Sequence, residues 1–189
     1  MTFAANSFYV ANTGNVLRFD YQSGQLKLNG TGSEITKLTP GGYNQHWTRN
    51  IVTDPDGQKL YVSVGSKSNA EAEELPRASI QVMNLDGSAK TTYASGLRNP
   101  VGLDFHPVTK ELYAAVNERD ELGDDLVPDY FTKVKQGGFY GWPYAYLSPN
   151  LLDPRHLQGD RIERPDLAAK TITPDVLFQA HSAALGVQF

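Results

Sequence analysis

The stretch Leu60-Tyr61-Val62-Ser63-Val64 decides the fold, because it recurs along the chain at a fixed spacing. It resembles Phe8-Tyr9-Val10-Ala11-Asn12 before it and Leu112-Tyr113-Ala114-Ala115-Val116 after it. The tyrosines stand at positions 9, 61 and 113, which gives two intervals of 52 residues. Self-similarity at a fixed period of tens of residues is typical of repeat architectures, so each copy is expected to be one structural unit.

The second and third copies each contain two β-rich runs joined by a short polar turn after a proline. The turns are Asp56-Gly57-Gln58-Lys59 and Val108-Thr109-Lys110-Glu111, and this pattern predicts antiparallel hairpins. A partial fourth copy, Gly186-Val187-Gln188-Phe189, echoes Gly102-Leu103-Asp104-Phe105 at an offset of 84 residues. The longer offset predicts an insertion at about 120–180.

These units predict an all-β chain made of β-propeller blades. Short runs rich in Tyr, Val and Ile and frequent Gly and Pro favour strands over helices. A unit of about 50 residues suits a blade of several strands, whereas the alternative, a β-sandwich, gives no reason for a fixed spacing. We therefore predict one partial β-propeller domain over 1–189, with about three to four blades. Since a ring of so few blades leaves open edges, we expect either a larger propeller or a second copy that completes the ring.

Composition excludes several function classes. The chain has 189 residues, with 17 Lys and Arg against 21 Asp and Glu, a net charge of −4 and no cysteine. A mildly acidic chain without a basic cluster is not expected to bind nucleic acid or an anionic membrane surface. Disulfides, thiolate metal sites and a cysteine nucleophile are absent. We expect no membrane span and see no signal peptide at the start of this sequence.

The period also brings polar residues into register. His46 and Arg98 are 52 residues apart, so they occupy equivalent places in adjacent blades. The offset of 84 takes Arg98 to Ser182, next to His181. We expect these side chains to converge near the central channel, where convergent polar groups indicate a binding site. The alternative for Arg98 is a structural role, bracing a loop through backbone carbonyls.

Four motifs in order then resemble a known family. They are Gln45-His46-Trp47-Thr48-Arg49-Asn50, Gly96-Leu97-Arg98-Asn99-Pro100-Val101-Gly102-Leu103, Asn117-Glu118-Arg119-Asp120-Glu121-Leu122-Gly123-Asp124-Asp125 and Gly137-Gly138-Phe139-Tyr140-Gly141-Trp142-Pro143. Together they resemble the glucose/sorbosone dehydrogenases, in particular the sorbosone-dehydrogenase-like branch. That family consists of six-bladed propellers that use pyrroloquinoline quinone (PQQ), and the resemblance implies that this chain is truncated at both ends.

The resemblance implies roles for individual residues. His46 matches the family's general base, which takes the proton of a sugar hydroxyl while hydride moves to the quinone; imidazole suits this role near neutral pH. Arg98 matches the arginine that binds the quinone oxygens and stabilises the charge that develops there. Asn99 would add an amide contact to the cofactor, and His181 aligns with a segment that flanks it.

The resemblance also implies a calcium site. The family's Ca²⁺ is held partly by backbone carbonyls in a loop that aligns with Asp120 and Glu121. Oxygen ligands suit this cation, which polarises the quinone. This sequence lacks the Gly-Pro that better-characterised relatives have there, and the alternative is a solvated acidic loop. Four aromatic residues are expected either to stack on a sugar or quinone or to pack between blades: Trp47, Tyr140, Trp142 and Tyr144.

The predicted function is PQQ- and calcium-dependent oxidation of an aldose or a sorbosone-like aldehyde. The implied partners are a sugar substrate and an external electron acceptor, with a homo-oligomer as a way to complete the ring, and the implied location is periplasmic or secreted. One alternative is a non-catalytic propeller fragment or interaction module. A second is a lactonase-type propeller hydrolase, which would need several acidic or Asn side chains pointing into the channel.

Overall fold

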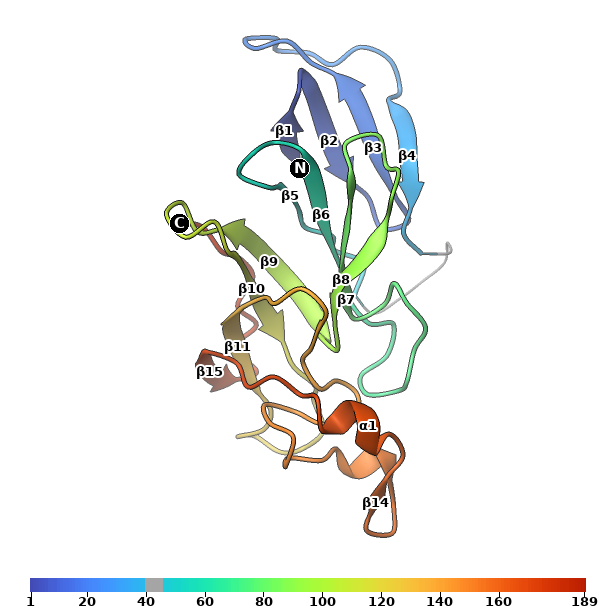
Figure 1. Cartoon of the computed structure of the whole chain (residues 1–189), viewed down its shortest axis with the longest axis vertical. Coiled ribbons are helices and arrows are strands. Elements are labelled where there is room, and N and C mark those ends of the chain that lie inside the picture. The colour runs from blue at the N-terminus through green and yellow to red at the C-terminus, as the bar shows by residue number, and fades with distance from the viewer. Residues whose placement is uncertain (40–45) are drawn as a thin grey trace.

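The computed structural model describes residues 1–39 and 46–189. These residues form four β-sheets, and three of them are propeller blades, each with four antiparallel strands, that follow one another along the chain (Figure 1). The first blade contains β1 (Thr2–Ala4), β2 (Ser7–Ala11), β3 (Asn15–Asp20) and β4 (Ser33–Lys37). The second contains β5 (Ile51–Thr53), β6 (Lys59–Val64), β7 (Ser79–Asn84) and β8 (Thr91–Ser95). The third contains β9 (Asn99–Phe105), β10 (Leu112–Asn117), β11 (Pro128–Lys133) and β15 (Val176–Ala180).

The partial β-propeller predicted from the repeat is confirmed. Tyr9, Tyr61 and Tyr113 all lie in the second strand of their blades, β2, β6 and β10. The predicted hairpin turns join β5 to β6 and β9 to β10, each pair being antiparallel. The period therefore marks equivalent places in successive blades, as the register argument requires.

The partial fourth copy lies alongside the inner strand of the third blade. A Cβ atom on Gly102 would come within 2.8 Å of the backbone of Gly186 and Val187, so the two segments touch. The backbone N–H of Phe189 donates to the Asp104 carboxylate at 3.0 Å, and the Phe189 ring packs on Tyr113. Residues 186–189 form no strand, but they occupy the place of an inner strand beside β9.

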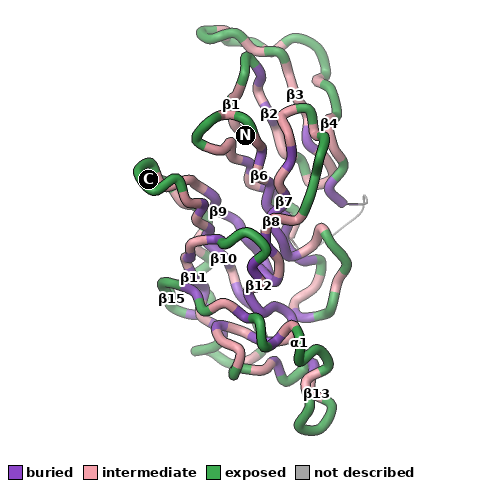
Figure 2. Tube along the Cα trace, viewed as in Figure 1, coloured by how far each residue is buried: buried purple, intermediate pink, exposed green. Residues whose placement is uncertain are grey.

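Two apolar layers between the blades make the core, which appears as the purple stretches in Figure 2. The layer between the first and second blades is made of Tyr9, Val16, Leu38, Ile51, Leu60, Val62, Val64 and Met83. The layer between the second and third blades is larger, and includes Ile80, Leu97, Leu103, Leu112, Val116 and Tyr130. Burial of these side chains stabilises the stacked blades, because apolar surface removed from water is the dominant favourable term in folding.

Residues 134–175 leave the third blade between β11 and β15, and we call them the excursion. The range predicted as an insertion, about 120–180, thus contains both strands as well as the excursion. In the excursion, β12 (Gly138–Phe139) pairs in parallel with β8 and covers the outer edge of the second blade. The remaining elements are a 3₁₀ turn (Pro154–His156), β13 (Leu157–Gln158), β14 (Arg161–Ile162) and α1 (Pro165–Ala168). No helix in the described part of the chain is long and apolar enough to cross a membrane.

One glycine allows the first two blades to approach closely. Gly87 lies in the β7–β8 turn with φ +82°, and a Cβ there would stand 2.0 Å from the Ile35 carbonyl oxygen of β4. We predict that Gly87→Ala destabilises the protein by about 3 kcal/mol, the sum of a left-handed backbone penalty and a steric clash. Gly24→Ala is the matched control: its φ is +84° with nothing within 4 Å, so it should cost about 1 kcal/mol. Urea unfolding of both variants measures the difference, and equal losses would contradict the packing argument.

Candidate functional site

The predicted site residues lie at one end of the blades. In a four-stranded antiparallel blade, the loop before the inner strand and the loop between the second and third strands meet at the same end. His46 and Arg98 precede β5 and β9, loops 65–78 and 118–127 join the second and third strands, and His181 follows β15. We call this end the site end.

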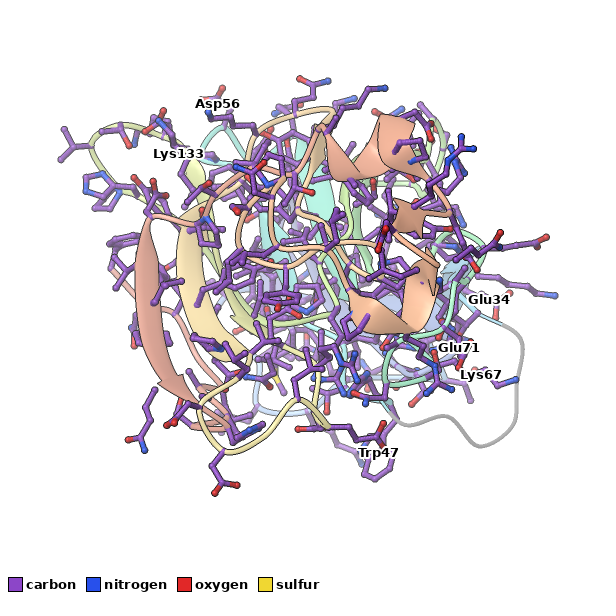
Figure 3. All side chains as sticks on the ribbon, turned by 90° about the horizontal axis from the view of Figure 1, so that it is seen from below. Glu34, Trp47, Asp56, Lys67, Glu71 and Lys133 are labelled. Carbon is purple, nitrogen blue, oxygen red and sulfur yellow. The ribbon has the colours of Figure 1, made fainter. Side chains whose placement is uncertain are left out.

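Figure 3, which views the molecule from below, shows the site end and the opposite end of the blades. Trp47, Lys67 and Glu71, which belong to site-end loops, lie toward one side of the molecule. Asp56 in the β5–β6 turn and Lys133 at the end of β11 lie on the opposite side. The chemistry predicted for His46 and Arg98 thus belongs to a single face of the described structure.

Asn69 is the centre of the hydrogen-bond network at the site end. Its Oδ1 accepts from Arg98 Nη2 and from the backbone N–H of Asp120, both at 2.9 Å. Its Nδ2 donates to the Asp120 carbonyl at 3.2 Å. Its own carbonyl accepts from Arg98 Nε at 3.0 Å and from Trp142 Nε1 at 2.9 Å. One side chain and one peptide group therefore hold the second blade, the third blade and the excursion together.

Arg98 is buried, with 3% of its surface exposed, and the protein engages most of its donors. Besides the two bonds to Asn69, Nη1 donates to the Glu118 carbonyl at 2.5 Å, and Nη2 contacts the Asp120 carboxylate at 3.3 Å. Of its five N–H groups, these contacts leave one on Nη1 without a partner in the described residues. In this structure Arg98 braces the loops, the alternative considered above, and its contact with a cofactor stays a prediction.

His46 is fixed in one tautomer by Ser66. Its Nδ1 lies 3.0 Å from the Ser66 carbonyl oxygen and 3.0 Å from Ser66 Oγ. A carbonyl oxygen can only accept, so Nδ1 carries the proton and Nε2 keeps its lone pair. Ser66 Oγ gives its own proton to the Ser68 carbonyl at 2.6 Å, which leaves it as an acceptor for the imidazole. The nitrogen available for proton transfer is therefore Nε2.

Burial and nearby cations keep this imidazole neutral. Desolvation, followed by the charge of Arg98, lowers the pKa of His46 to about 4, although the Ser66 carbonyl and Asp120 oppose the shift. At pH 7 the side chain is thus an acceptor rather than an acid. The hydrogen bond from the Ser66 N–H to the Arg98 carbonyl, at 2.8 Å, links the two predicted residues through the backbone.

Gly65 brings His46 and Asn99 together. A Cβ atom at position 65 would stand 2.7 Å from His46 Cβ and 2.4 Å from Asn99 Oδ1, so only glycine fits there. Asn99 is 8% exposed, and its Oδ1 is buried without a hydrogen-bond partner in the described residues. A buried polar atom without a partner costs free energy, so it indicates a place where a ligand or water binds.

His181 joins the network through Asp120. Its Nε2 donates to the Gly123 carbonyl at 3.0 Å, and its Nδ1 lies 3.3 Å from the Asp120 carboxylate. Both ring nitrogens thus face acceptors, and the Gly123 carbonyl, followed by Asp120, raises the pKa of His181. Asp120 contacts Arg98 and His181 at once, so the structure brings together the residues that the repeat placed in register.

The residues aligned with the calcium loop are already engaged. The Asp120 carbonyl accepts from Arg119 Nε at 2.8 Å as well as from Asn69. Glu121, exposed and with φ +72°, lies 3.9 Å from Arg119. Within residues 1–39 and 46–189, no three His, Cys, Asp or Glu side chains are grouped so that they could hold a metal ion.

The Glu118 carboxyl group does not neutralise the charge of Arg98 at neutral pH. It is 4% exposed, and burial raises the pKa of its carboxyl to about 8, even though the charge of Arg98 opposes the shift. The group is therefore protonated at pH 7. The acid whose side chain contacts the Arg98 guanidinium is Asp120, at 3.3 Å.

The four aromatic candidates separate by exposure. Tyr140 and Trp142, both in the excursion, are buried at 0% and 4% exposed. Tyr144 packs edge-on against His156. Trp47, adjacent to His46 in sequence, is 58% exposed at the site end (Figure 3). Its exposed indole gives it the surface for stacking on a sugar. Gln45 lies outside the described residues.

Sequence reasoning missed Gly65, Ser66 and Asn69. All three lie in the polar run Gly65-Ser66-Lys67-Ser68-Asn69, which reads as an ordinary loop because Gly, Ser and Asn are common in turns. Their roles depend on backbone carbonyls and on contacts with residues at least 20 positions away, which periodicity does not reveal. The position of this loop could have identified it, because a loop after the second strand of a blade lies at the same end as the residues that precede the inner strand.

Comparisons with known proteins agree with this fold. The family model described as TrAA12-like matches residues 1–136. An uncharacterized protein of Borreliella burgdorferi is 36% identical over 117 residues, which are 60% of this chain and 30% of that protein. The carbohydrate-active enzyme of family AA12 from Trichoderma reesei aligns with a TM-score of 0.80 at 20% identity, over 99% of this chain and 57% of that one.

The soluble aldose sugar dehydrogenase of Escherichia coli, in its apo form, aligns with a TM-score of 0.65 at 17% identity, over 91% of this chain and 51% of that one. At 20% and 17% identity, these solved structures show that the chain shares their fold. The chain thus spans about half the length of the propellers that it resembles, and 30% of the Borreliella relative.

We predict that Asn69→Ala lowers the free energy of unfolding by about 3 kcal/mol, because it leaves a buried arginine and a backbone N–H without acceptors. Asn150→Ala, on the exposed surface of the excursion, is the control and should change stability by less than about 0.5 kcal/mol. Urea unfolding measures both. Equal stabilities of the two variants would show that Asn69 does not organise the site.

The low pKa of His46 predicts a pH dependence of stability. The unfolded state binds a proton near pH 6.5, whereas folded His46 stays neutral down to about pH 4. The contribution of His46 to the free energy of unfolding is therefore complete above about pH 6.5 and is lost as the pH falls toward 4. In His46→Gln, the loss of stability between pH 7 and pH 4 should be smaller than in the parent protein. Urea unfolding at a series of pH values tests this, and an unchanged slope would contradict the burial of a neutral imidazole.

Proposed function

The chain belongs to the TrAA12-like family, and from that premise we propose that it serves in the oxidation of a sugar, with His46 as the proton acceptor. The observation that carries the proposal is the fixed tautomer of His46: Nδ1 is held by Ser66, and Nε2 is left as a base at neutral pH. The fold likeness to a family AA12 enzyme and to an aldose sugar dehydrogenase supports the same class of reaction.

In the proposed step, a sugar hydroxyl gives its proton to His46 Nε2 while the carbon that bears it gives up hydride, and a carbonyl forms. A quinone such as PQQ, when bound, supplies the acceptor for the hydride and its two electrons. Ser66 orients the imidazole by holding Nδ1 in place. The hydrogen bond from the Ser66 backbone N–H to the Arg98 carbonyl keeps His46 in register with the third blade.

The residues around His46 fit a polar, anionic cofactor. Asn99 Oδ1 and two guanidinium nitrogens of Arg49 are buried without partners in the described residues, which suits a ligand that carries both donors and acidic oxygens. Asn99, and the Nη1 of Arg98 with its remaining N–H, are the groups of this chain that would hold the quinone. The calcium dependence is a weaker fit, because the Asp120 carbonyl is engaged, and no step of the proposal runs through the ion.

We assign the substrate to the aldoses or sorbosone-like aldehydes, with an external electron acceptor to reoxidise the cofactor. Trp47 is the residue proposed to stack on the sugar ring, since its indole is exposed next to the base in sequence. A second copy of the chain, completing the ring, remains a proposal for the partner.

A non-catalytic propeller module is the second candidate. The observation that favours it is the engagement of Arg98, whose donors are mostly taken by Asn69, Glu118 and Asp120. A lactonase-type hydrolase lacks comparable support, because the described residues do not gather acidic side chains into a metal site.

The test is turnover of D-glucose by the purified chain with added PQQ, with and without Ca²⁺, followed by reduction of a dye acceptor. We predict dye reduction that falls at least about 100-fold in His46→Gln, the usual contribution of a general base. His106→Gln, in the β9–β10 turn at the opposite end, should leave the rate unchanged.

Absence of both PQQ binding and turnover would favour the non-catalytic module. Turnover that survives in His46→Gln would remove His46 from the mechanism while leaving the enzyme class in place.

A further inference from the structure

Arg49 holds the loop that carries His46 and leaves part of its guanidinium unused. Nη1 donates to the carbonyls of His46 at 2.7 Å and Thr48 at 2.8 Å. Thr13 Oγ1 donates to the carbonyl between them, that of Trp47, at 3.1 Å. Three consecutive carbonyls of an irregular segment are thus held by side chains, which fixes the position of the base.

The other two nitrogens of Arg49, Nε and Nη2, are buried and have no hydrogen-bond partner in the described part of the chain. The residue is only 8% exposed, so water does not replace a partner across an open surface. Buried guanidinium groups are normally paired, because an unpaired buried charge is costly. This unpaired cation therefore needs an explanation.

Nε and Nη2 form one edge of the guanidinium. Their N–H bonds point in the same direction, and this edge matches the two oxygens of a carboxylate in a bidentate pair. Since the opposite corner, Nη1, is committed to the carbonyls of His46 and Thr48, the free edge is held in one orientation. A fixed fork of two donors is preorganised for a planar oxyanion.

The charges around Arg49 favour an anion as well. Arg77, whose Nη1 lies 3.4 Å from the Gly65 carbonyl, adds a second positive charge, and it lowers the pKa of Arg49 together with burial, burial being the larger cause. That pKa is still about 10, so Arg49 is a cation at neutral pH. The sequence contains no Asp or Glu between Glu34 and Asp54, so no acid close in the chain neutralises it.

The acids of the site are occupied elsewhere. The Asp120 carboxylate contacts Arg98 and His181. The carboxylate of Glu73, which is near Arg77, accepts from the backbone N–H groups of Lys67 and Ser68. Asn99 Oδ1, the other orphaned polar atom beside His46, is an acceptor and can serve a hydroxyl of the same ligand.

We propose that the Nε–Nη2 edge of Arg49 is a binding site for a ligand carboxylate, placed next to the His46 base. The ligand that binds at the site end is therefore expected to be acidic. Its carboxylate belongs either to an acidic quinone cofactor or to an acidic sugar such as a uronic acid. The proposal concerns binding and goes beyond the assignment of the oxidation reaction, so it can be tested without turnover.

The test is isothermal titration calorimetry of the full chain with three probes: D-glucuronate, D-glucose as its neutral counterpart, and PQQ. Arg49→Lys keeps a positive charge and a donor for the carbonyls but loses the two-pronged edge. Arg161→Lys, on an exposed strand of the excursion, is the matched control. We expect at least one acidic probe to bind at least tenfold more weakly to Arg49→Lys than to the control, and D-glucose to be unaffected.

The results distinguish the two sources of the carboxylate and can overturn the site. Weakened glucuronate binding assigns the carboxylate to an acidic sugar, and weakened PQQ binding alone assigns it to the cofactor. If neither acidic probe binds the parent protein, or if Arg49→Lys binds both as the control does, the carboxylate site is overturned. Should Arg49→Lys fail to fold, two further measurements replace it: the shift of the Arg49 Nε–H resonance on adding each probe, and the affinity of Arg77→Gln. An unmoved resonance with unchanged Arg77→Gln affinity overturns the proposal equally.

Discussion

Arg98 is a buried cation, and the rest of the site depends on how the protein satisfies it. Its guanidinium lies between the second and third blades, where water does not reach it, so the loops must supply acceptors. Asn69 supplies two of them, the carbonyl of Glu118 a third and the Asp120 carboxylate a fourth. To do so, these three residues must converge from two different loops. The buried charge therefore sets the geometry of the site end.

The state of His46, the proposed base, is a consequence of that arrangement. The loop that contains Asn69 begins at Gly65 and Ser66, and Ser66 fixes the tautomer of His46 through a carbonyl and a hydroxyl. The charge of Arg98 and the loss of water keep the imidazole neutral. Arg49 donates to the carbonyls on either side of Trp47 and so helps to position His46. A neutral, oriented imidazole among buried arginines is an arrangement suited to accepting a proton beside an anionic ligand.

The excursion shows how a propeller adds support outside its repeat. It covers the edge strand β8 and then reaches the site end, where Trp142 Nε1 donates to the Asn69 carbonyl and His156 Nε2 donates to the Ala70 carbonyl at 2.6 Å. Arg119 and Asp153, both nearly buried, pair at 2.9 Å and join the third blade to the excursion. The loop that orients His46 is thus held by the excursion as well as by the blades.

The fold was predictable from the spacing of Tyr9, Tyr61 and Tyr113, because equivalent residues of a repeat occupy equivalent strands, and the same spacing placed the candidate site residues at one end of the blades. The same spacing related His46 to Arg98. Asn69 and Ser66 were not predictable, since backbone carbonyls carry much of their effect and any polar loop residue offers one. The unpaired edge of Arg49 was equally hidden, because an arginine is identified as unpaired only when its surroundings are known.

The central claim is that His46 stands neutral at pH 7 with its proton on Nδ1. The direct measurement is a long-range ¹H–¹⁵N correlation spectrum of the histidine rings of the uniformly ¹⁵N-labelled protein, with His46 assigned by its loss in His46→Gln. We predict a protonated Nδ1 and a bare Nε2 for His46, and the same tautomer in Ser66→Gly, because the backbone carbonyl that accepts from Nδ1 stays in place. A protonated Nε2, or a doubly protonated ring at pH 7, would contradict it.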